Sequence, residues 1–151
     1  MTTDPVSNQD YSPIPLSKSD EKTWAMLAHL SVIINFISGF FGILAALAIY
    51  LIFKDRSRYV AYHSMQAFIF QLIWWGGAGV LIGLMWSIVG LLSAIVIGII
   101  LIPFALILTF VLLLLPLAAL VYGIIGAVQT SQGQEFDYWL IGDWTRNMLE
   151  S

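Results

Sequence analysis

Two long stretches without a charged residue constrain the fold of this chain more than any other feature. Residues 23–53 contain no Asp, Glu, Lys or Arg, and neither do residues 59–134, a run of 76 residues. The composition agrees, because 60% of the 151 residues are hydrophobic and 10% are charged, whereas a soluble domain has about 25% charged residues. One Lys, Arg or Asp at the centre of a membrane helix costs roughly 2.5–3.5 kcal/mol. The sequence therefore predicts an all-α, polytopic integral membrane protein that forms a transmembrane helical bundle.

The shorter uncharged stretch predicts a pair of short helices. As one helix, its 31 residues would be about 46 Å long. That length exceeds the hydrocarbon thickness of about 30 Å and falls short of two full crossings. Asn35, Ser38 and Gly39 lie at its middle, where a break is expected. We expect helices at residues 22–37 and 40–53, with a single strongly tilted helix as the alternative.

The longer uncharged stretch is long enough for two or three crossings. About 70 of its residues are apolar enough to be buried, and they would form about 105 Å of helix. Three spans would fit, with breaks near residues 85–87 and at Pro103. Two long spans joined by a re-entrant or interfacial segment would also fit.

The two ends of the chain are polar and carry most of its charges. Residues 1–19 contain three of the five prolines, which predicts a disordered tail. Residues 132–151 mix acidic with aromatic side chains, and aromatic side chains settle at headgroup depth, so we expect an interfacial C-terminal tail. The loop between the uncharged stretches supplies topology-setting cations, Lys54, Arg56 and Arg58. By the positive-inside rule, this loop and the N-terminus face the cytoplasm.

A polar stripe follows this loop. Tyr59, His63 and Gln66 share one face of a helix because they are spaced by three and four residues. Polar side chains at membrane depth normally face the interior of a bundle or a water-filled cavity. The stripe is therefore predicted either to pack against other helices through hydrogen bonds or to line a path through the membrane.

Small residues mark a second helix-packing feature. Gly79 and Gly83 are four residues apart, in a stretch that also contains Gly76 and Gly77. Small residues on one face let two helix backbones approach closely. We therefore expect Gly79 and Gly83 to lie at a contact between helices.

Residue types that carry catalysis or bind metals are scarce. The chain has no cysteine, and its two histidines, His29 and His63, have no carboxylate beside them in the uncharged stretches. Zinc usually takes three or four protein ligands. The sequence also lacks the nucleophile, zinc-binding and phosphate-binding motifs of common enzyme classes. We expect no catalytic residue, no cofactor, no metal site and no enzymatic activity.

Three segments of the chain resemble a known family. They are DEKTWAMLAHLS (residues 20–31), YLIFKDRSRYVAYHSMQAFIFQL (50–72) and the closing EFDYWLIGDW (135–144). These segments resemble an uncharacterised prokaryotic membrane family that is similar to the Tic-twenty subunit of the chloroplast inner-envelope protein-import translocon. The middle segment is the most specific part of the resemblance.

The resemblance implies four transmembrane helices with both termini on one side of a prokaryotic plasma membrane. We therefore expect a transmembrane domain at residues 20–131 with about four membrane helices, and five as the alternative. The expected helices lie at about residues 22–37, 40–53, 58–84 and 87–129, with breaks near Pro103.

The function predicted from the sequence is that of a small helical scaffold or a subunit of a membrane complex. The resemblance implies the alternative, a component of a protein-translocation or solute-conducting channel. Expected partners are the lipid bilayer and either further copies of the chain or other members of a membrane complex. We expect no nucleic-acid partner.

Overall fold

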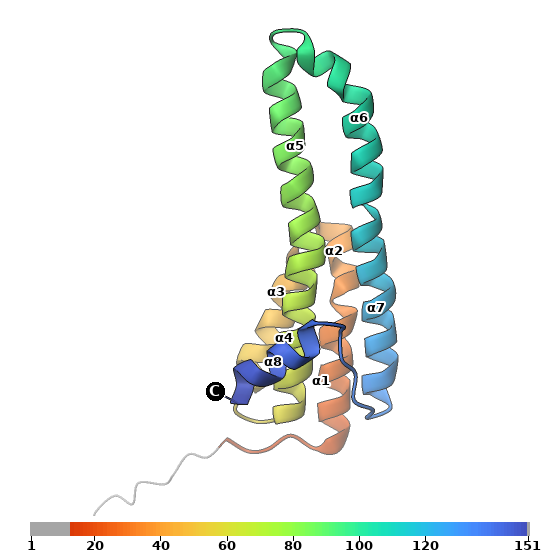
Figure 1. Cartoon of the computed structure of the whole chain (residues 1–151). Helices are drawn as coiled ribbons and strands as arrows, with labels where there is room; N and C mark the ends of the chain where they lie inside the picture. The colour runs from red at the N-terminus through yellow and green to blue at the C-terminus, as the bar shows by residue number, and fades with distance from the viewer. Residues whose placement is uncertain (1–12, 151) are drawn as a thin grey trace, which may run out of the picture.

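The computed structural model describes residues 13–150, so most of the predicted N-terminal tail lies outside the described residues. Within that range every regular element is a helix, as the predicted all-α fold class requires. The helices form two antiparallel hairpins of unequal length (Figure 1). Residues 18 and 19, which the sequence assigned to the tail, already belong to the first helix.

The short hairpin consists of α1 (Lys18–Leu30), α2 (Val32–Ser38) and α3 (Phe41–Phe53). Ser17 caps α1, because its hydroxyl oxygen accepts a hydrogen bond from the backbone N–H of Asp20. This bond satisfies one of the free N–H groups at the start of the helix. The chain reverses direction at Gly39, whose positive φ of 85° suits a residue without a side chain.

The long hairpin has two arms, which meet at a turn of residues 94–96. The first arm joins α4 (Arg58–Gln71), a π-helical turn (Leu72–Gly76) and α5 (Gly77–Ser93) into 36 residues of helix. The second arm joins α6 (Ile97–Leu112) and α7 (Leu114–Ser131) into 35 residues.

The two breaks that the sequence suggested in this region are not where the helix ends. The break expected near residues 85–87 lies instead at residues 94–96. Ser87 is accommodated within α5, because its hydroxyl donates a hydrogen bond to the carbonyl oxygen of Gly83. Pro103 lies inside α6, as membrane helices tolerate proline better than helices in water do.

The structure has fewer helices of membrane-spanning length than the sequence predicted. Two helices in the described chain are long and apolar enough to cross a membrane, Arg58–Ser93 and Ile97–Ser131, rather than four or five. The return arm of the short hairpin, α3, has 13 residues and is therefore about 20 Å long. That length is too short for a hydrocarbon core of about 30 Å.

The short hairpin lies beside only one half of the long hairpin (Figure 1). There α1 packs against α7 and α4, and α3 packs against α4. The final helix, α8 (Ile141–Glu150), crosses α4 on the outside of the same half. We call this half, residues 13–76 and 113–150, the base. The other half, α5 and α6 with their turn, is called the extension.

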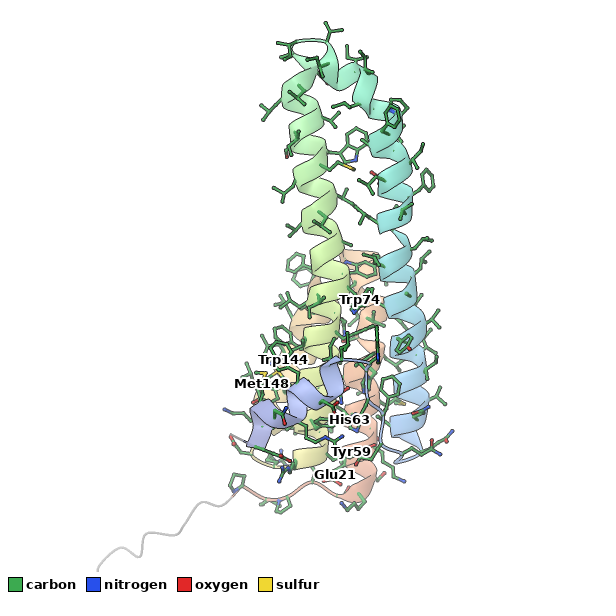
Figure 2. All side chains as sticks on the ribbon, in the orientation of Figure 1. Glu21, Tyr59, His63, Trp74, Trp144 and Met148 are labelled. Atoms are coloured by element: carbon green, nitrogen blue, oxygen red, sulfur yellow. The ribbon has the colours of Figure 1, made fainter. Side chains whose placement is uncertain are left out.

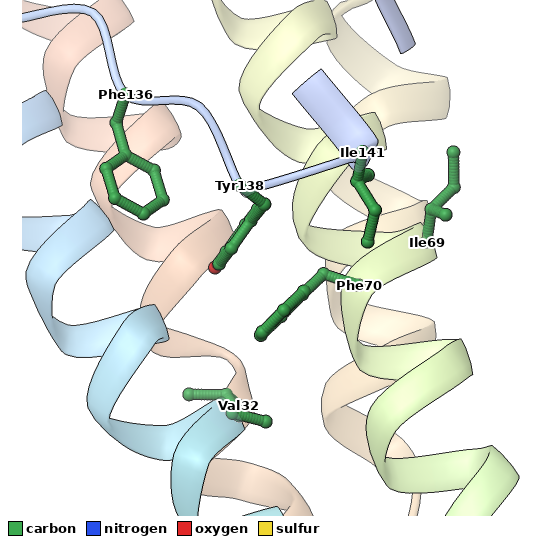
Figure 3. Packing of buried hydrophobic residues seen from close by; sticks show 7 residues of the cluster. Val32, Ile69, Phe70, Phe136, Tyr138 and Ile141 are labelled. Carbon is green, nitrogen blue, oxygen red and sulfur yellow. The ribbon is translucent and has the colours of Figure 1, made fainter. Parts of the chain in front are cut away.

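The core of the base is closed by residues 132–140, which we call the C-terminal strap. The strap runs from α7 to α8 and inserts Phe136 and Tyr138 between the helices (Figure 3). The ring of Tyr138 stacks on Phe70 at a centroid distance of 3.9 Å. The strap and the helices together form one buried cluster, which contains Val32, Ile69, Phe70, Ala119, Phe136, Tyr138 and Ile141.

Candidate functional site: a buried polar network in the base

The predicted polar stripe lies on α4 and faces the C-terminal strap. Figure 2 shows Tyr59 and His63 on this part of the base. His63 and Gln66 are fully buried, whereas Tyr59 is half-buried. The hydroxyl of Tyr59 donates to the backbone carbonyl oxygen of Gln134 at 3.1 Å. The stripe thus begins at the surface and ends within the core.

The side-chain amide of Gln66 binds the backbone of the strap through both its nitrogen and its oxygen. The amide Nε2 donates to the carbonyl oxygen of Phe136 at 3.2 Å, and Oε1 accepts from the backbone N–H of Tyr138 at 2.9 Å. Both hydrogen bonds are buried. A strap without regular secondary structure needs such partners, because an unpaired backbone group in the core costs about 1–3 kcal/mol.

The two histidines form a short hydrogen-bonded chain with Tyr138. His29 Nδ1 lies 2.9 Å from the hydroxyl of Tyr138, and His29 Nε2 lies 3.4 Å from His63 Nδ1. A neutral imidazole has one N–H group and one lone pair, so the tautomers of the two rings are coupled. His63 Nε2 is buried and has no hydrogen-bond partner among the described residues.

A second buried group of polar side chains lies where α1 meets α2. Gln71 accepts a hydrogen bond from the Asn35 amide at 2.9 Å and donates one to the Ser31 hydroxyl at 2.9 Å. The oxygen Oδ1 of Asn35 then accepts from the backbone N–H of Ile43 at 3.2 Å. This group links α1, α2, α3 and α4. Because these polar groups are paired, the interruption between α1 and α2 at Ser31 can be buried without leaving hydrogen-bonding groups unpaired.

The outside of the base carries a smaller polar cluster around Tyr62. Its hydroxyl donates to Asp137 Oδ1 at 2.6 Å, and Arg146 donates to the other oxygen of the same carboxylate at 3.1 Å. The hydrogen bond from Arg146 to Tyr62, together with the charge of Asp137, raises the pKa of Arg146. This cluster fastens α8 and the strap to α4.

At the start of α1, Glu21 accepts hydrogen bonds from Lys18 at 2.9 Å and from Ser57 at 2.7 Å. Burial alone would raise the pKa of Glu21, but these two hydrogen bonds and the charge of Lys18 together outweigh burial, so that the pKa is lowered. The bond to Ser57 ties the start of α1 to the start of α4. Hydrogen bonding to the charged carboxylate, together with the charge of Lys18, is the cause of the shift in pKa.

The predicted topology-setting cations lie at the same end of the molecule. Lys54, Arg56 and Arg58 are exposed. Arg56 donates to the carbonyl oxygen of Ile14 at 3.0 Å, and Arg58 pairs with Glu150 at 3.1 Å. Every charged residue that the structure describes belongs to the base.

The structure does not bring Gly79 and Gly83 into a contact between helices of this chain. Both are exposed on α5, and no described atom lies within 4 Å of the position that a side-chain carbon would take at either glycine. Close approach occurs at other glycines. Gly98 of α6 faces the backbone of Val89 in α5, and Gly42 of α3 faces Ser31.

The sequence interpretation missed the partners of the stripe. It assigned all aromatic residues of the C-terminal segment to the membrane interface, whereas Phe136 and Tyr138 are buried and Trp139 is exposed. Residues 136–139 alternate between buried and exposed, as expected of an extended segment that packs against a core. Asn35 and Gln71 carried a second signal, because polar side chains in apolar helices need a partner.

No arrangement in the described residues resembles a metal centre. Among residues 13–150, no group of three or more His, Cys, Asp and Glu side chains could hold a metal ion. His29 and His63 point ring nitrogens at each other at 3.4 Å. Because His29 Nε2 and His63 Nδ1 face each other and His29 Nδ1 faces the Tyr138 hydroxyl, the two rings are not arranged as ligands around one ion.

The fold and the contacts together define a small helical membrane protein with a hydrogen-bonded polar core at one end. Residues 20–145 match the MamF/MmsF family, described as the magnetosome magnetite crystal formation protein family, and the chain belongs to this family. No curated protein and no solved structure matches the chain.

This assignment corrects the resemblance drawn from the sequence. The segments that resembled the Tic-twenty-like family lie within the residues that match MamF/MmsF, and the two families are different. The resemblance is therefore wrong, and the protein-transport function that it implied has no support. What holds is the coarser prediction of a small membrane protein.

Proposed function

We propose that this chain is a membrane-embedded scaffold or complex subunit that takes part in magnetite crystal formation, and that it is not an enzyme. Membership of the MamF/MmsF family supports the link to magnetite. One observation carries the scaffold role. The buried amide side chains of the base, those of Asn35, Gln66 and Gln71, hydrogen-bond to the chain's own strap and helices.

In this proposal the polar stripe packs the base and does not line a path. Gln66 and His63 are 0% exposed. Gln66 binds the backbone of Phe136 and Tyr138 in the strap. The rings of His29, Tyr59 and Tyr62 pack around His63. A four-helix bundle of this size normally has a core that is filled by side chains.

In this proposal the chain acts through its base and through the surrounding membrane. The turn between α5 and α6, at the opposite end of the molecule from the base, does not bind a mineral through charged side chains. Residues 59–134 carry no charged side chain, and the turn between α5 and α6 is formed by Ala94, Ile95 and Val96. Carboxylate oxygens suit hard metal cations, and the extension offers none. The charged groups that a partner protein could recognise lie on the base.

We further propose that the base faces the cytoplasm and that the chain resides in the magnetosome membrane. The cations Lys54, Arg56 and Arg58 support this orientation through the positive-inside rule. The family assignment supports the location. Lipid is the first partner, and the exposed base is the surface for another copy or another subunit.

Complementation of a magnetosome-forming host that lacks its own family member tests this function. We expect the wild-type chain and the exposed-site variant Gln132→Leu to restore crystal size, measured by electron microscopy. Gln66→Leu should restore it only in proportion to the amount of folded chain in the membrane.

Two results would contradict the proposal. Crystals that are unchanged by the wild-type chain would exclude a role in their formation. A complete loss of function in Gln66→Leu, at wild-type levels of folded protein, would show that Gln66 acts directly and is not a packing residue.

A further inference from the structure

The short hairpin ends at the middle of the long one. Its tip contacts Trp75, because the indole N–H of Trp75 donates to the carbonyl oxygen of Gly39 and the ring of Phe36 packs against the Trp75 ring at 4.6 Å. Trp75 lies halfway along the 36-residue helix Arg58–Ser93. Four helices therefore surround the core below Trp75, and two helices continue above it (Figure 1).

The polar groups at this tip are satisfied within the chain. The backbone N–H of Gly39 donates to the carbonyl oxygen of Asn35 at 2.7 Å. Ser38 Oγ accepts from the N–H of Phe41 at 3.2 Å and donates to the carbonyl oxygen of Ile34 at 2.7 Å. Non-helical backbone is tolerated at membrane depth only where such partners exist.

The side chains around the tip are large, apolar and exposed. Ile37 is 87% exposed, and Phe40 and Phe41 are 52% and 54% exposed. Water is an unfavourable environment for such a cluster, because burying one large apolar side chain contributes about 1.5–3 kcal/mol. A tip with satisfied polar groups and exposed apolar side chains fits hydrocarbon.

We infer that the protein is a wedge in the bilayer and binds preferentially to membranes that are convex on the side of its base. The 36-residue helix is about 54 Å long, which exceeds the hydrocarbon core of about 30 Å, so part of the base lies outside the core. The tip of the short hairpin enters the leaflet nearest the base, and α5 and α6 alone cross the other leaflet. Since each helix is about 10 Å across, the chain displaces about twice as much area in the base-side leaflet. Lipid of that leaflet is the partner of the exposed tip.

The wedge does not depend on the proposed role in crystal formation. It depends on the half-length of the short hairpin and on the environment of its tip. The oblique helix α8, which lies outside α4 on the base, increases the asymmetry in the same direction. A membrane vesicle with the base on its outer surface has the curvature that this shape favours.

Sorting between flat and curved membranes tests the inference. The full chain has no cysteine, so Asn147→Cys on the exposed face of α8 places one dye on the base. Tubes are pulled from giant vesicles of phosphatidylcholine and phosphatidylglycerol, and a membrane-impermeant quencher identifies the orientation of the base. With the base outside, we expect the dye density in the tube to exceed that in the flat membrane and to rise as the tube narrows. With the base inside, it should fall.

A second label, at Ile37→Cys, shows whether lipid, water or a second copy of the chain surrounds the tip. A nitroxide there should be accessible to oxygen, inaccessible to a water-soluble relaxation agent, and free of spin–spin coupling. Ile14→Cys, which is 78% exposed at the base, serves as the matched aqueous control. Equal dye density in tube and flat membrane would overturn the inference. It would also be overturned by a water-exposed residue 37, or by coupling that shows a second copy covering the tip.

Discussion

In the base, ten polar side chains are buried, and most of them bind the chain's own backbone or one another, whereas no described residue of the extension is both polar and buried. The base is held by hydrogen bonds that fix direction as well as distance. The two helices of the extension are joined by close apolar contact and by a hydrogen bond of 2.9 Å from the Trp86 indole to Thr109. Figure 2 shows side chains standing out from both helices there.

The comparison shows that the two halves of this apolar chain differ in the structures that they can accommodate. The base can hold the irregular strap and the break between α1 and α2, because its polar groups pair internally. The two helices of the extension pair their own backbone groups apart from Pro103, so their outer faces can lie against lipid. Changes in the base should therefore cost more folding free energy than matched changes in the extension.

The largest effect should come from Gln66→Leu. The leucine leaves the carbonyl of Phe136 and the N–H of Tyr138 without their buried partner, and each such loss costs about 1–3 kcal/mol. We expect about 2–5 kcal/mol of destabilisation in detergent unfolding experiments, with the strap becoming accessible to proteolysis. Gln132→Leu, at an exposed position, should stay within about 0.5 kcal/mol of wild type. Equal destabilisation by Gln66→Leu and Gln132→Leu would contradict the claim that the buried hydrogen bonds stabilise the base.

Two glycine substitutions sharpen the contrast. An added methyl group at Gly42 would collide with the backbone of Ser31 and lie 2.7 Å from Asn35 Oδ1, so Gly42→Ala should destabilise the base by about 1–3 kcal/mol. The same change at Gly83 meets open space and should be neutral or stabilising by up to about 1 kcal/mol, because alanine is the better helix former. Thermal unfolding of both variants measures the difference. A strongly destabilised Gly83→Ala would instead indicate that a second copy packs there.

A smaller effect is expected within the extension. Trp86→Phe removes the hydrogen bond to Thr109 and retains most of the apolar ring. Interhelical hydrogen bonds in membrane proteins contribute about 0.6–1.7 kcal/mol. We expect a loss in this range, with hydrogen exchange of the strap unchanged. Faster exchange at Tyr138 in this variant would show that the two halves are not independent.

The smallest expected effect is a pH dependence at the base. The hydrogen bonds from Lys18 and Ser57 lower the pKa of Glu21 in the folded chain. Its ionisation therefore adds stability at neutral pH, and this stability is lost as the pH falls through the lowered pKa. The contribution should be about 1 kcal/mol or less, because Lys18 is exposed. Unfolding titrated against pH should lose this component in Glu21→Gln, and an unchanged profile would contradict the assignment.

The two uncharged stretches and the composition predicted the membrane class, and the positions of Asn35 and Gly39 predicted a break in the first uncharged stretch. Length alone could not predict the number of spans, because an apolar stretch can cross a membrane or pack beside helices that do. Likewise, Gln66 was recognised as an unusual polar residue on a helix. Its partner lies 70 residues away, and a contact between a helix and an irregular strap has no periodicity to reveal it.

The central claim is that one long hairpin crosses the membrane, while the charged end of the base stays on one side and the tip of the short hairpin lies in the hydrocarbon. Single cysteines at Ile95, Ile37 and Asn147, labelled in sealed vesicles with a membrane-impermeant maleimide, test this most directly. We expect Asn147→Cys to react from the side of the base, Ile95→Cys to react from the opposite side only, and Ile37→Cys to react from neither side. Labelling of residues 95 and 147 from the same side would contradict the crossing of the long hairpin.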